Sequence, residues 1–198
     1  INDTEVWAQR ISYVGELGFE LYVKKENALK LFDILMDKGK SFQISLCGMH
    51  AMDIMRMESG YLHWGHDISP EENQFEAGLN FAVSFKKNIN FIGRAALEKK
   101  RDKKDHKKFK MLILNNSKEG APLLLHDEPI YLKDKIVGRT TSGCYSFNYS
   151  KNLAFGYINS GLTSDQIDKE AFEIEVEKKK YSASVITRPL NNKKLSSL

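Results

Sequence analysis

Two glutamates lie beside glycines within residues 10–23, and they are the first side chains that could do chemistry. Glu16 lies between Gly15 and Gly18, and Glu20 follows closely. A carboxylate in this setting could reach a ligand that the backbone also approaches, because glycine has no side chain to block it. The same stretch also fits an ordinary hairpin with solvated carboxylates, since hairpin turns of this composition are common.

Two histidines and an aspartate form a second candidate group, since His63, His66 and Asp67 fall within one short segment. Two imidazoles and a carboxylate can coordinate a metal ion. The segment is, however, a loop with glycine and proline, and a full ligand set with known spacing is missing. We therefore expect no metal site.

The two cysteines, Cys47 and Cys144, are far apart in the sequence and do not suggest a disulfide framework. A reducing cytoplasm is therefore the expected location. A catalytic cysteine would need a neighbouring group that lowers the pKa of its thiol. None is recognisable around Cys144, so we expect this side chain to be buried by packing.

Hydrophobic periodicity predicts the elements that position the two glutamates. Alternation over residues 4–13 and 18–24 predicts two antiparallel strands, joined by a tight turn at residues 15–18. Asn27 is a suitable N-cap for a helix, and Gly39 stands where a helix commonly ends. Between them one apolar stripe predicts a core-facing helix: Ala28, Leu31, Phe32, Leu35 and Met36.

A second helix is predicted over residues 47–60, after a short strand at residues 42–44. Its methionines, at three-residue spacing, predict a buried stripe: Met49, Met52 and Met55. Arg56 follows Asp53 by three residues, which by itself indicates a surface ion pair of little energetic value.

Six short strand-like runs occupy the C-terminal part of the chain, and turn residues separate several of them. Short strands at such spacing, without a strong helix among them, predict a small β-barrel or sandwich. The runs are residues 108–114, 129–132, 136–141, 153–158, 171–176 and 181–186.

Several motifs resemble one family. Residues 12–20, Ser-Tyr-Val-Gly-Glu-Leu-Gly-Phe-Glu, resemble the Tyr-Thr-Gly-Glu-x-Gly-Phe-Glu signature of the aminomethyltransferases. That family includes the T-protein of the glycine cleavage system and the folate-binding halves of dimethylglycine and sarcosine dehydrogenases. Residues 51–60 are similar to its Ala-x-Asp-x-x-Arg-x-Glu-x-Gly helix, and residues 91–97 to its Phe-Ile-Gly-Arg-x-x-Leu motif.

Further stretches follow in the family's order. Residues 61–67 and 76–79 resemble its Tyr-x-x-x-Gly-x-Asp and Glu-Ala-Gly-Leu run, and residues 138–146 resemble the Gly-x-x-Thr-Ser-Gly-x-x-Ser pattern of its C-terminal barrel. The sequence Trp-Gly-His-Asp at residues 64–67 is more similar to the dehydrogenase-fused branch than to the T-protein.

The resemblance implies an α+β fold that is the second half of a T-protein-like folate-binding architecture. Residues 1–90 would be the C-terminal part of the folate-binding domain, residues 91–108 a helix and charged linker, and residues 109–198 a small antiparallel β-barrel. The aspartate near the reacting folate nitrogen lies in the family's first half, so the resemblance implies no catalytic residue in this chain.

The resemblance implies that three residues bind folate. Tyr13 matches the tyrosine that lines the folate site, and Glu20 matches the glutamate that hydrogen-bonds the pterin ring. A carboxylate can accept two parallel N–H bonds from an aminopyrimidinone edge, and a buried pair of this kind discriminates strongly. Arg56 matches an arginine near the p-aminobenzoyl-glutamate side, where a guanidinium suits a carboxylate tail.

Two departures from the T-protein pattern favour the dehydrogenase-like or demethylase branch. Met52 stands where the T-protein has a second arginine, four residues before Arg56. The T-protein's C-terminal arginine has no clear equivalent after Pro189, although Lys193 or Lys194 could replace it.

Composition restricts the partners. The chain is 41% hydrophobic and 28% charged, with a net charge of +4, which indicates a globular protein. The basic run at residues 99–108 is interrupted by aspartates and has no aromatic residue for base stacking, so we expect a solvated linker and no nucleic-acid partner. No apolar run approaches a membrane span, and no signal peptide is visible. The chain starts at Ile1 and not at a methionine, so we expect a fragment of a longer protein.

The expected function is tetrahydrofolate-dependent aminomethyl or methyl transfer from a small amine donor. The partners would be folate and the amine-derived one-carbon donor, with a possible upstream flavin domain in the parent protein. Two alternatives stay open: a non-catalytic folate-binding or regulatory module, and a basic RNA-binding protein whose binding would weaken steeply with salt.

Overall fold

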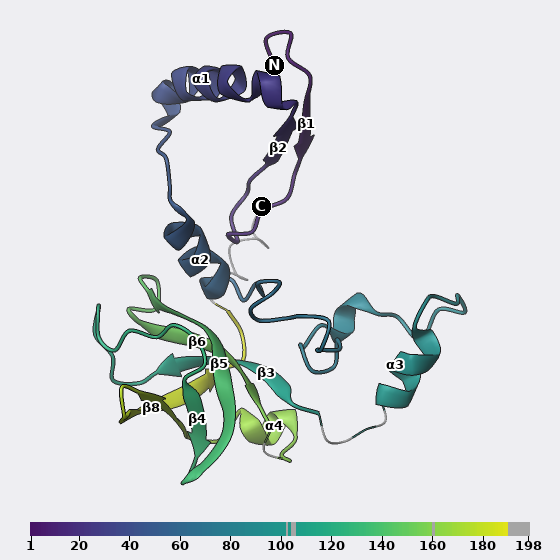
Figure 1. Cartoon of the computed structure of the whole chain (residues 1–198), viewed down its shortest axis with the longest axis vertical. Coiled ribbons are helices and arrows are strands. Elements are labelled where there is room, and N and C mark those ends of the chain that lie inside the picture. The colour runs from purple at the N-terminus through teal and green to yellow at the C-terminus, as the bar shows by residue number, and fades with distance from the viewer. Residues whose placement is uncertain (102, 104–105, 160, 190–198) are drawn as a thin grey trace.

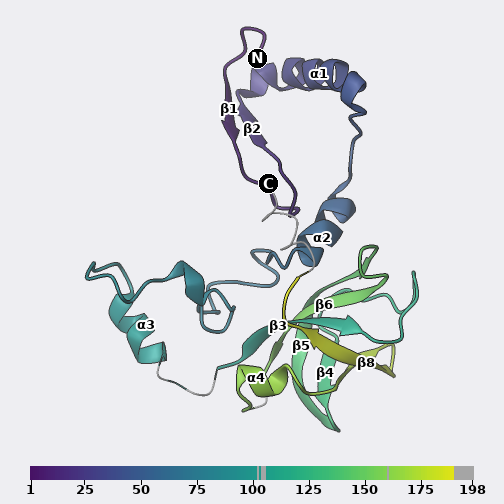
Figure 2. The same ribbon diagram turned by 180° about the vertical axis from the view of Figure 1, so that it is seen from behind.

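The computed structural model describes residues 1–101, 103, 106–159 and 161–189, and it combines helices and strands around a closed barrel. The N-terminal part holds strands β1 (Val6–Gln9) and β2 (Glu20–Val23) and helices α1 (Ala28–Gly39), α2 (Met49–Glu58) and α3 (Arg94–Arg101). Figure 1 shows the hairpin and α1 at the end of the molecule away from the barrel, with α2 between them. The view from behind shows the same order (Figure 2).

The C-terminal part is a six-stranded antiparallel barrel with strand order β3-β6-β5-β4-β7-β8. Of the two architectures that the strand runs predicted, the barrel is confirmed. Its strands are β3 (Lys108–Leu114), β4 (Pro129–Leu132), β5 (Lys135–Ser146), β6 (Lys151–Ile158), β7 (Phe172–Val176) and β8 (Lys179–Ile186). A one-turn helix, α4 (Ser164–Ile167), begins with a capping box between Thr163 and Gln166.

Alternation along the strands builds the barrel interior. In β7 the apolar residues Phe172, Ile174 and Val176 are buried, and the glutamates between them are partly exposed. Strand β6 is buried along almost its whole length, because its two faces serve two clusters. Ala154 and Ile158 face the interior cluster, and Leu153 and Phe155 pack in a second cluster with Met57 of α2. The barrel therefore carries α2 on its outer surface.

The N-terminal hairpin pairs as predicted, but its predicted tight turn is wrong. Strands β1 and β2 are antiparallel, and the ladder ends at the pair Gln9 and Glu20, which leaves residues 10–19 as a loop. The loop bonds elsewhere: the Tyr13 hydroxyl donates to the Leu62 carbonyl oxygen at 2.8 Å, and Ser59 Oγ donates to the Val14 carbonyl oxygen at 3.3 Å. These contacts replace the continued strand pairing.

Helix α1 is confirmed, but the prediction that its stripe packs in a core is wrong. Among its residues only Leu31 is buried, and Phe32 is 45% exposed. Figure 1 shows α1 beside the hairpin and away from the barrel, so the barrel does not cover its apolar stripe. The short strand predicted at residues 42–44 is also wrong, because Lys40–Phe42 is a 3-10 turn and Gln43 has a φ of 57°, outside the extended region.

Helix α2 is confirmed, but the prediction that its methionines form a buried stripe is wrong. Met49 is 72% exposed, whereas Met57 is completely buried. The reason is that only the last turn of α2 lies against β5 and β6, so burial begins at Arg56 and continues through Ser59.

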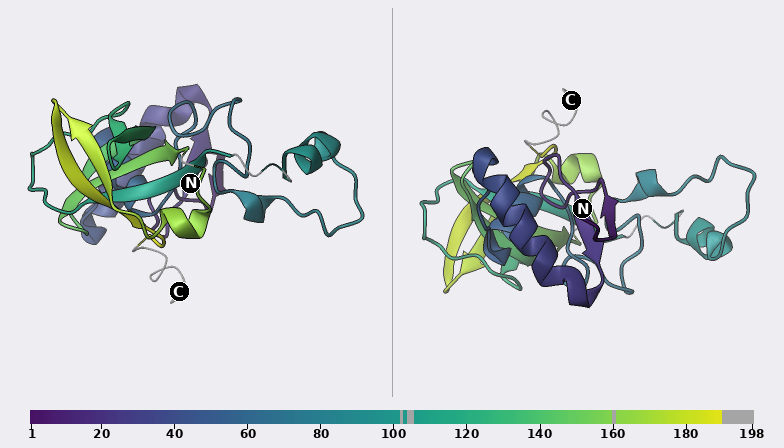
Figure 3. Two further views of the ribbon diagram at one scale, coloured as in Figure 1. Left: turned by 90° about the horizontal axis from the view of Figure 1, so that it is seen from below. Right: turned by 90° about the horizontal axis from the view of Figure 1, so that it is seen from above.

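Residues 80–101 form an arm that projects to one side of the barrel, as the views from below and above show (Figure 3). Helix α3 lies on this arm, and Arg94 at its start donates to the carbonyl oxygens of Phe85, Lys87 and Ile89. Within the part of the chain that is described, no helix has the length and apolar character that crossing a bilayer requires.

Candidate functional site

A large cavity is lined by one of the three residues predicted to bind folate, Tyr13. It measures about 890 Å³ and lies between the hairpin loop, the end of α2 and one side of the barrel. Its walls are rich in aromatic side chains: Tyr13, Tyr61, Phe81, Phe109 and Phe155. We call this space the Tyr13 cavity.

Two tyrosines stand at the wall of the Tyr13 cavity. The rings of Tyr13 and Tyr61 are stacked, with centroids 6.1 Å apart and an angle of 14° between their planes. Burial raises the pKa of Tyr13, although the positive charge of Arg56 opposes the effect. The Tyr13 hydroxyl therefore stays protonated and can donate its hydrogen bond to Leu62. The arrangement offers flat apolar faces to a planar ligand.

The barrel supplies a polar group at the same cavity. Lys110 of β3 donates to the carboxylate of Asp168 and, at 2.6 Å, to Ser164 Oγ. This ion pair is only partly exposed, with 11% of the Lys110 side chain and 24% of the Asp168 side chain accessible. The cavity thus joins aromatic walls to a few fixed polar groups, which is typical of small-molecule sites.

Glu20 does not line the Tyr13 cavity. It is partly exposed at the start of β2, and the Tyr22 hydroxyl donates to Glu20 Oε2 at 2.5 Å. Its carboxylate keeps capacity to accept further bonds, since each ionised oxygen can accept more than one. Tyr13 therefore lies on the loop before β2 and Glu20 on β2 itself, and of the two only Tyr13 lines the cavity.

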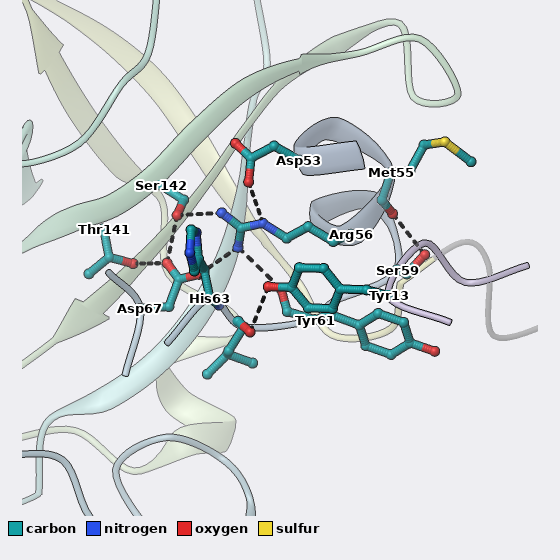
Figure 4. Close-up of polar contacts among 11 residues, drawn as sticks. Tyr13, Asp53, Met55, Arg56, Ser59, Tyr61, His63, Asp67, Thr141 and Ser142 are labelled. Carbon is teal, nitrogen blue, oxygen red and sulfur yellow. Dashed lines mark hydrogen bonds and ion pairs between the residues drawn. The ribbon is translucent and has the colours of Figure 1, made fainter. Parts of the chain in front are cut away.

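Arg56 is almost completely buried, at 1% exposure, and its guanidinium bonds to the protein on several sides (Figure 4). Nε donates to Asp53 Oδ1 at 2.7 Å, and Nη1 donates to Asp67 Oδ2 at 2.5 Å. Nη1 also donates to the Tyr61 carbonyl oxygen at 3.1 Å, and Nη2 donates to Ser142 Oγ at 2.8 Å. The ion pair with Asp53 that the spacing predicts is present, but the expectation that Arg56 lies at the surface is wrong, because the barrel covers its side chain.

Asp67 is the buried centre of the same network. Its Oδ1 accepts from Thr141 Oγ1 at 2.5 Å and from Ser142 Oγ at 2.8 Å. Its Oδ2 accepts from Arg56 and from the His63 amide at 2.8 Å. The Tyr157 hydroxyl donates to its carbonyl oxygen. Sequence reasoning missed these pairings, although both partners of each lie in motifs that it singled out.

Glu58 makes the second polar contact between α2 and the barrel. Its Oε1 accepts from Ser146 Oγ at 2.5 Å and from the Asn148 amide at 3.2 Å, and the Asn148 side chain donates to Oε2. Glu58 is 2% exposed, so these donors replace the water that its carboxylate oxygens lose on burial. The helix motif and the barrel motif are therefore complementary parts of one interface.

The structure places the suspected metal ligands as a stacked pair and a separate carboxylate. The rings of His63 and His66 lie 4.4 Å apart, centroid to centroid, whereas the Asp67 oxygens accept from Arg56, Thr141 and Ser142. Among the described residues, no three histidine, cysteine, aspartate or glutamate side chains gather where they could hold a metal ion.

Cys144 is buried in the cluster around Phe155, which confirms its expected packing role. Burial raises the pKa of its thiol to about 12, so it is a poor nucleophile at neutral pH. Met52 lines a smaller cavity of about 320 Å³ that Arg56 and His63 also border. Lys193 and Lys194 lie outside the described residues.

Two family models match the chain. Residues 1–87 match the GCVT N-terminal domain, and residues 107–191 match the glycine cleavage T-protein C-terminal barrel domain. The second match contains all six strands of the barrel.

Curated relatives include enzymes and a regulatory subunit. A mitochondrial dimethylglycine dehydrogenase of Mus musculus is 36% identical over 96% of this chain and 21% of its own length. An aminomethyltransferase of Listeria innocua is 34% identical over 91% of this chain and 47% of its own length. A mitochondrial pyruvate dehydrogenase phosphatase regulatory subunit of Mus musculus is 30% identical over 92% of this chain and 22% of its own length.

A solved structure has the same fold. The glycine cleavage system aminomethyltransferase T of Bartonella henselae matches with a TM-score of 0.78 at 24% identity, over 92% of this chain and 48% of that one. This chain therefore spans about half the length of the aminomethyltransferases and about a fifth of the dehydrogenase. Because two relatives are named as mitochondrial, the cytoplasmic location expected here stays a prediction.

Proposed function

Because this chain belongs to the aminomethyltransferase family of the glycine cleavage T-protein, we propose that it forms the second half of a tetrahydrofolate-dependent one-carbon transferase. The Tyr13 cavity would hold the folate. The observation that carries the proposal is that Tyr13, which the family motif marks, lines a cavity of about 890 Å³, together with Tyr61 and residues of the barrel.

The residues present fit such a ligand. Tetrahydrofolate has a planar aminopyrimidinone ring and a planar p-aminobenzoyl group, and the cavity offers several aromatic faces in about 890 Å³. That volume lies within the range of roughly 300 to 1,000 Å³ that is usual for small-molecule sites. Stacking on Tyr13 and Tyr61 would orient the flat rings, and Phe109 and Phe155 would exclude water from them.

When bound, tetrahydrofolate supplies the nitrogen that accepts the one-carbon unit. The part of this chain is to bind and orient, since holding two reactants together can supply most of the barrier lowering. Glu20 would pair with the N–H groups of the pterin edge, where that edge reaches the mouth of the site. The catalytic aspartate would come from the first half of the family's architecture, which residues 1–198 do not contain.

Within the family we propose the dehydrogenase-like branch, with a small amine as donor and an upstream flavin domain in the parent protein. The sequence Trp-Gly-His-Asp at residues 64–67 and the methionine at position 52 support the assignment to this branch. We further propose three regions: residues 1–90 for the folate-binding part, 91–108 for the helix and linker, and 109–198 for the barrel.

The test is a calorimetric titration of tetrahydrofolate into this chain and into variants. Tyr13→Ala should weaken binding by about tenfold or more, because an aromatic contact is lost together with its area. Phe147→Ala is the matched control, since Phe147 is 64% exposed and lies outside the lining of the cavity. Glu20→Ala tests the pterin contact separately. A folded chain that takes up no tetrahydrofolate would contradict the proposal for this chain.

A second function has one observation in its favour. The relative of Mus musculus named as a phosphatase regulatory subunit is 30% identical over most of this chain, so the fold also occurs in a protein named for regulation. Under this alternative the parent protein would bind folate and transfer no one-carbon unit. Single-turnover transfer from an amine donor to bound folate, measured on the full-length protein, distinguishes the two.

A further inference from the structure

We propose that Arg56 and Asp67 are positioning residues that hold Tyr13 and Tyr61 in place, and that Arg56 does not bind the carboxylate tail of the ligand. The inference rests on the proposed function, because it concerns the same cavity. It assigns to Arg56 a role different from the one that the family motif implies.

The guanidinium of Arg56 has little capacity left for a ligand. Four of its five N–H groups already donate, to Asp53, Tyr61, Asp67 and Ser142. It also lies over the Phe155 ring, at 5.3 Å from the centroid. A fork-like pair with another carboxylate needs two N–H groups side by side, and these are in use.

Asp67 gives the pair its fixed place on the barrel. The pairing of β5 with β6 shifts register between Thr140 and Ser142, so the strand is irregular where it meets Asp67. Regular strands point consecutive side chains to opposite faces, and a bulge changes that direction. Here the hydroxyls of Thr141 and Ser142 both reach Asp67 Oδ1.

From this pair the contact continues to the cavity through three consecutive residues. Arg56 Nη1 donates to the Tyr61 carbonyl oxygen, Tyr13 donates to the Leu62 carbonyl oxygen, and the His63 amide donates to Asp67. Figure 4 shows the Arg56 network and the two tyrosine rings in one group, joined by the dashed lines that end on this segment. Loss of the Arg56–Asp67 pair would release the backbone on which both rings depend.

Two probes separate positioning from tail binding. Tetrahydrofolate carries the p-aminobenzoyl-glutamate tail, and 6-methyltetrahydropterin lacks it. Under our proposal Arg56→Lys and Asp67→Asn each lower the binding affinity for both probes by the same factor. We expect about tenfold, which is the effect of losing a hydrogen bond to a charged group. Glu98→Gln is the control, because it breaks an arginine–carboxylate pair on the arm, outside the cavity. The proposal would be overturned if only the Arg56 variant lost affinity, and if it lost affinity for tetrahydrofolate but not for 6-methyltetrahydropterin.

A measurement without ligand keeps the inference independent of folate binding. In Arg56→Lys the amide of His63, which donates to Asp67 Oδ2, should exchange its hydrogen about tenfold faster, because that oxygen loses the guanidinium that fixes it from the side of α2. Amides in the middle of β6 should be unchanged, which shows that the barrel remains folded. Unchanged exchange at His63 would refute the positioning role. If the wild-type chain binds neither probe, the proposed function fails, and the exchange result still decides this inference.

Discussion

Thr141 and Ser142 are adjacent in sequence, yet both hydroxyls donate to the same oxygen of Asp67, at 2.5 and 2.8 Å. The irregular register of β5 makes this possible, and Arg56 completes the arrangement by donating to the other carboxylate oxygen. Buried carboxylates are tolerated only where donors surround them. The barrel, the segment after α2 and α2 itself are therefore joined at one fully paired charge.

Arg56→Met should lower the free energy of unfolding by about 3 to 5 kcal/mol, because it leaves Asp67 charged, buried and without its cation. Urea unfolding, followed by tryptophan fluorescence and by circular dichroism, measures the loss. Asp53→Ala is the matched control: its side chain is 41% exposed, so it should cost less than about 1 kcal/mol. Equal losses in the two variants would show that Arg56 is not held mainly by Asp67.

The sequence predicted the barrel better than it predicted this site. Strand periodicity is local, so residues 171–176 alone already indicated a strand, which the structure has as β7. Arg56 is different: three-residue spacing reveals Asp53, but Asp67 and Ser142 are 11 and 86 residues away in sequence. A partner at such a distance is set by the packing of α2 on β5, which no local pattern encodes. Residue spacing alone therefore could not predict that Arg56 is buried.

The same limit explains the corrections in the N-terminal part. Helical periodicity indicates that α1 has an apolar stripe, but whether that stripe is buried depends on the elements that cover it. In the same way, the glycines at positions 15 and 18 suggested a tight turn. The loop instead bonds to Ser59 and Leu62, and these residues follow α2.

Gly138→Ala should destabilise the barrel by about 3 kcal/mol or more, because overpacking against backbone cannot relax. An added Cβ would lie 1.8 Å from the carbonyl oxygen of Tyr157, on the neighbouring strand β6. Gly48→Ala is the control, since a Cβ there meets nothing within 4 Å, and it should cost less than about 1 kcal/mol. Thermal unfolding of both variants measures the difference, and similar melting temperatures would contradict the close packing of β5 on β6.

Lys107→Met should reduce stability at neutral pH and lose its effect in acid. Burial alone would raise the pKa of Glu72, but hydrogen bonds from Lys107 and Ser69 outweigh it, and the pKa lies below its usual value of 4.5. A lowered pKa means that the folded protein gains stability above the unfolded value and loses it as pH falls through the folded value.

The check is the urea midpoint of wild type and Lys107→Met at several pH values. The difference between the two should be largest near neutral pH and should shrink below about pH 4.5, as Glu72 becomes protonated in both. Lys40→Met, which removes an exposed ion pair with Asp37, serves as the control and should show little difference at any pH. A constant difference between wild type and Lys107→Met down to about pH 3 would contradict the contribution of the Glu72 charge.

Iodoacetamide at about pH 8 should label one cysteine of the native chain and both cysteines after unfolding. Cys47 is exposed, whereas Cys144 is buried and its pKa is raised to about 12, so only about one thiol in ten thousand is ionised at that pH. Mass spectrometry counts the adducts. Cys47→Ser should take up none in its native state, because Leu153 and Phe155 pack around the remaining thiol. Rapid native labelling of Cys144 would mean that the cluster between α2 and the barrel opens readily, and the reagent would then report the stability of that interface directly.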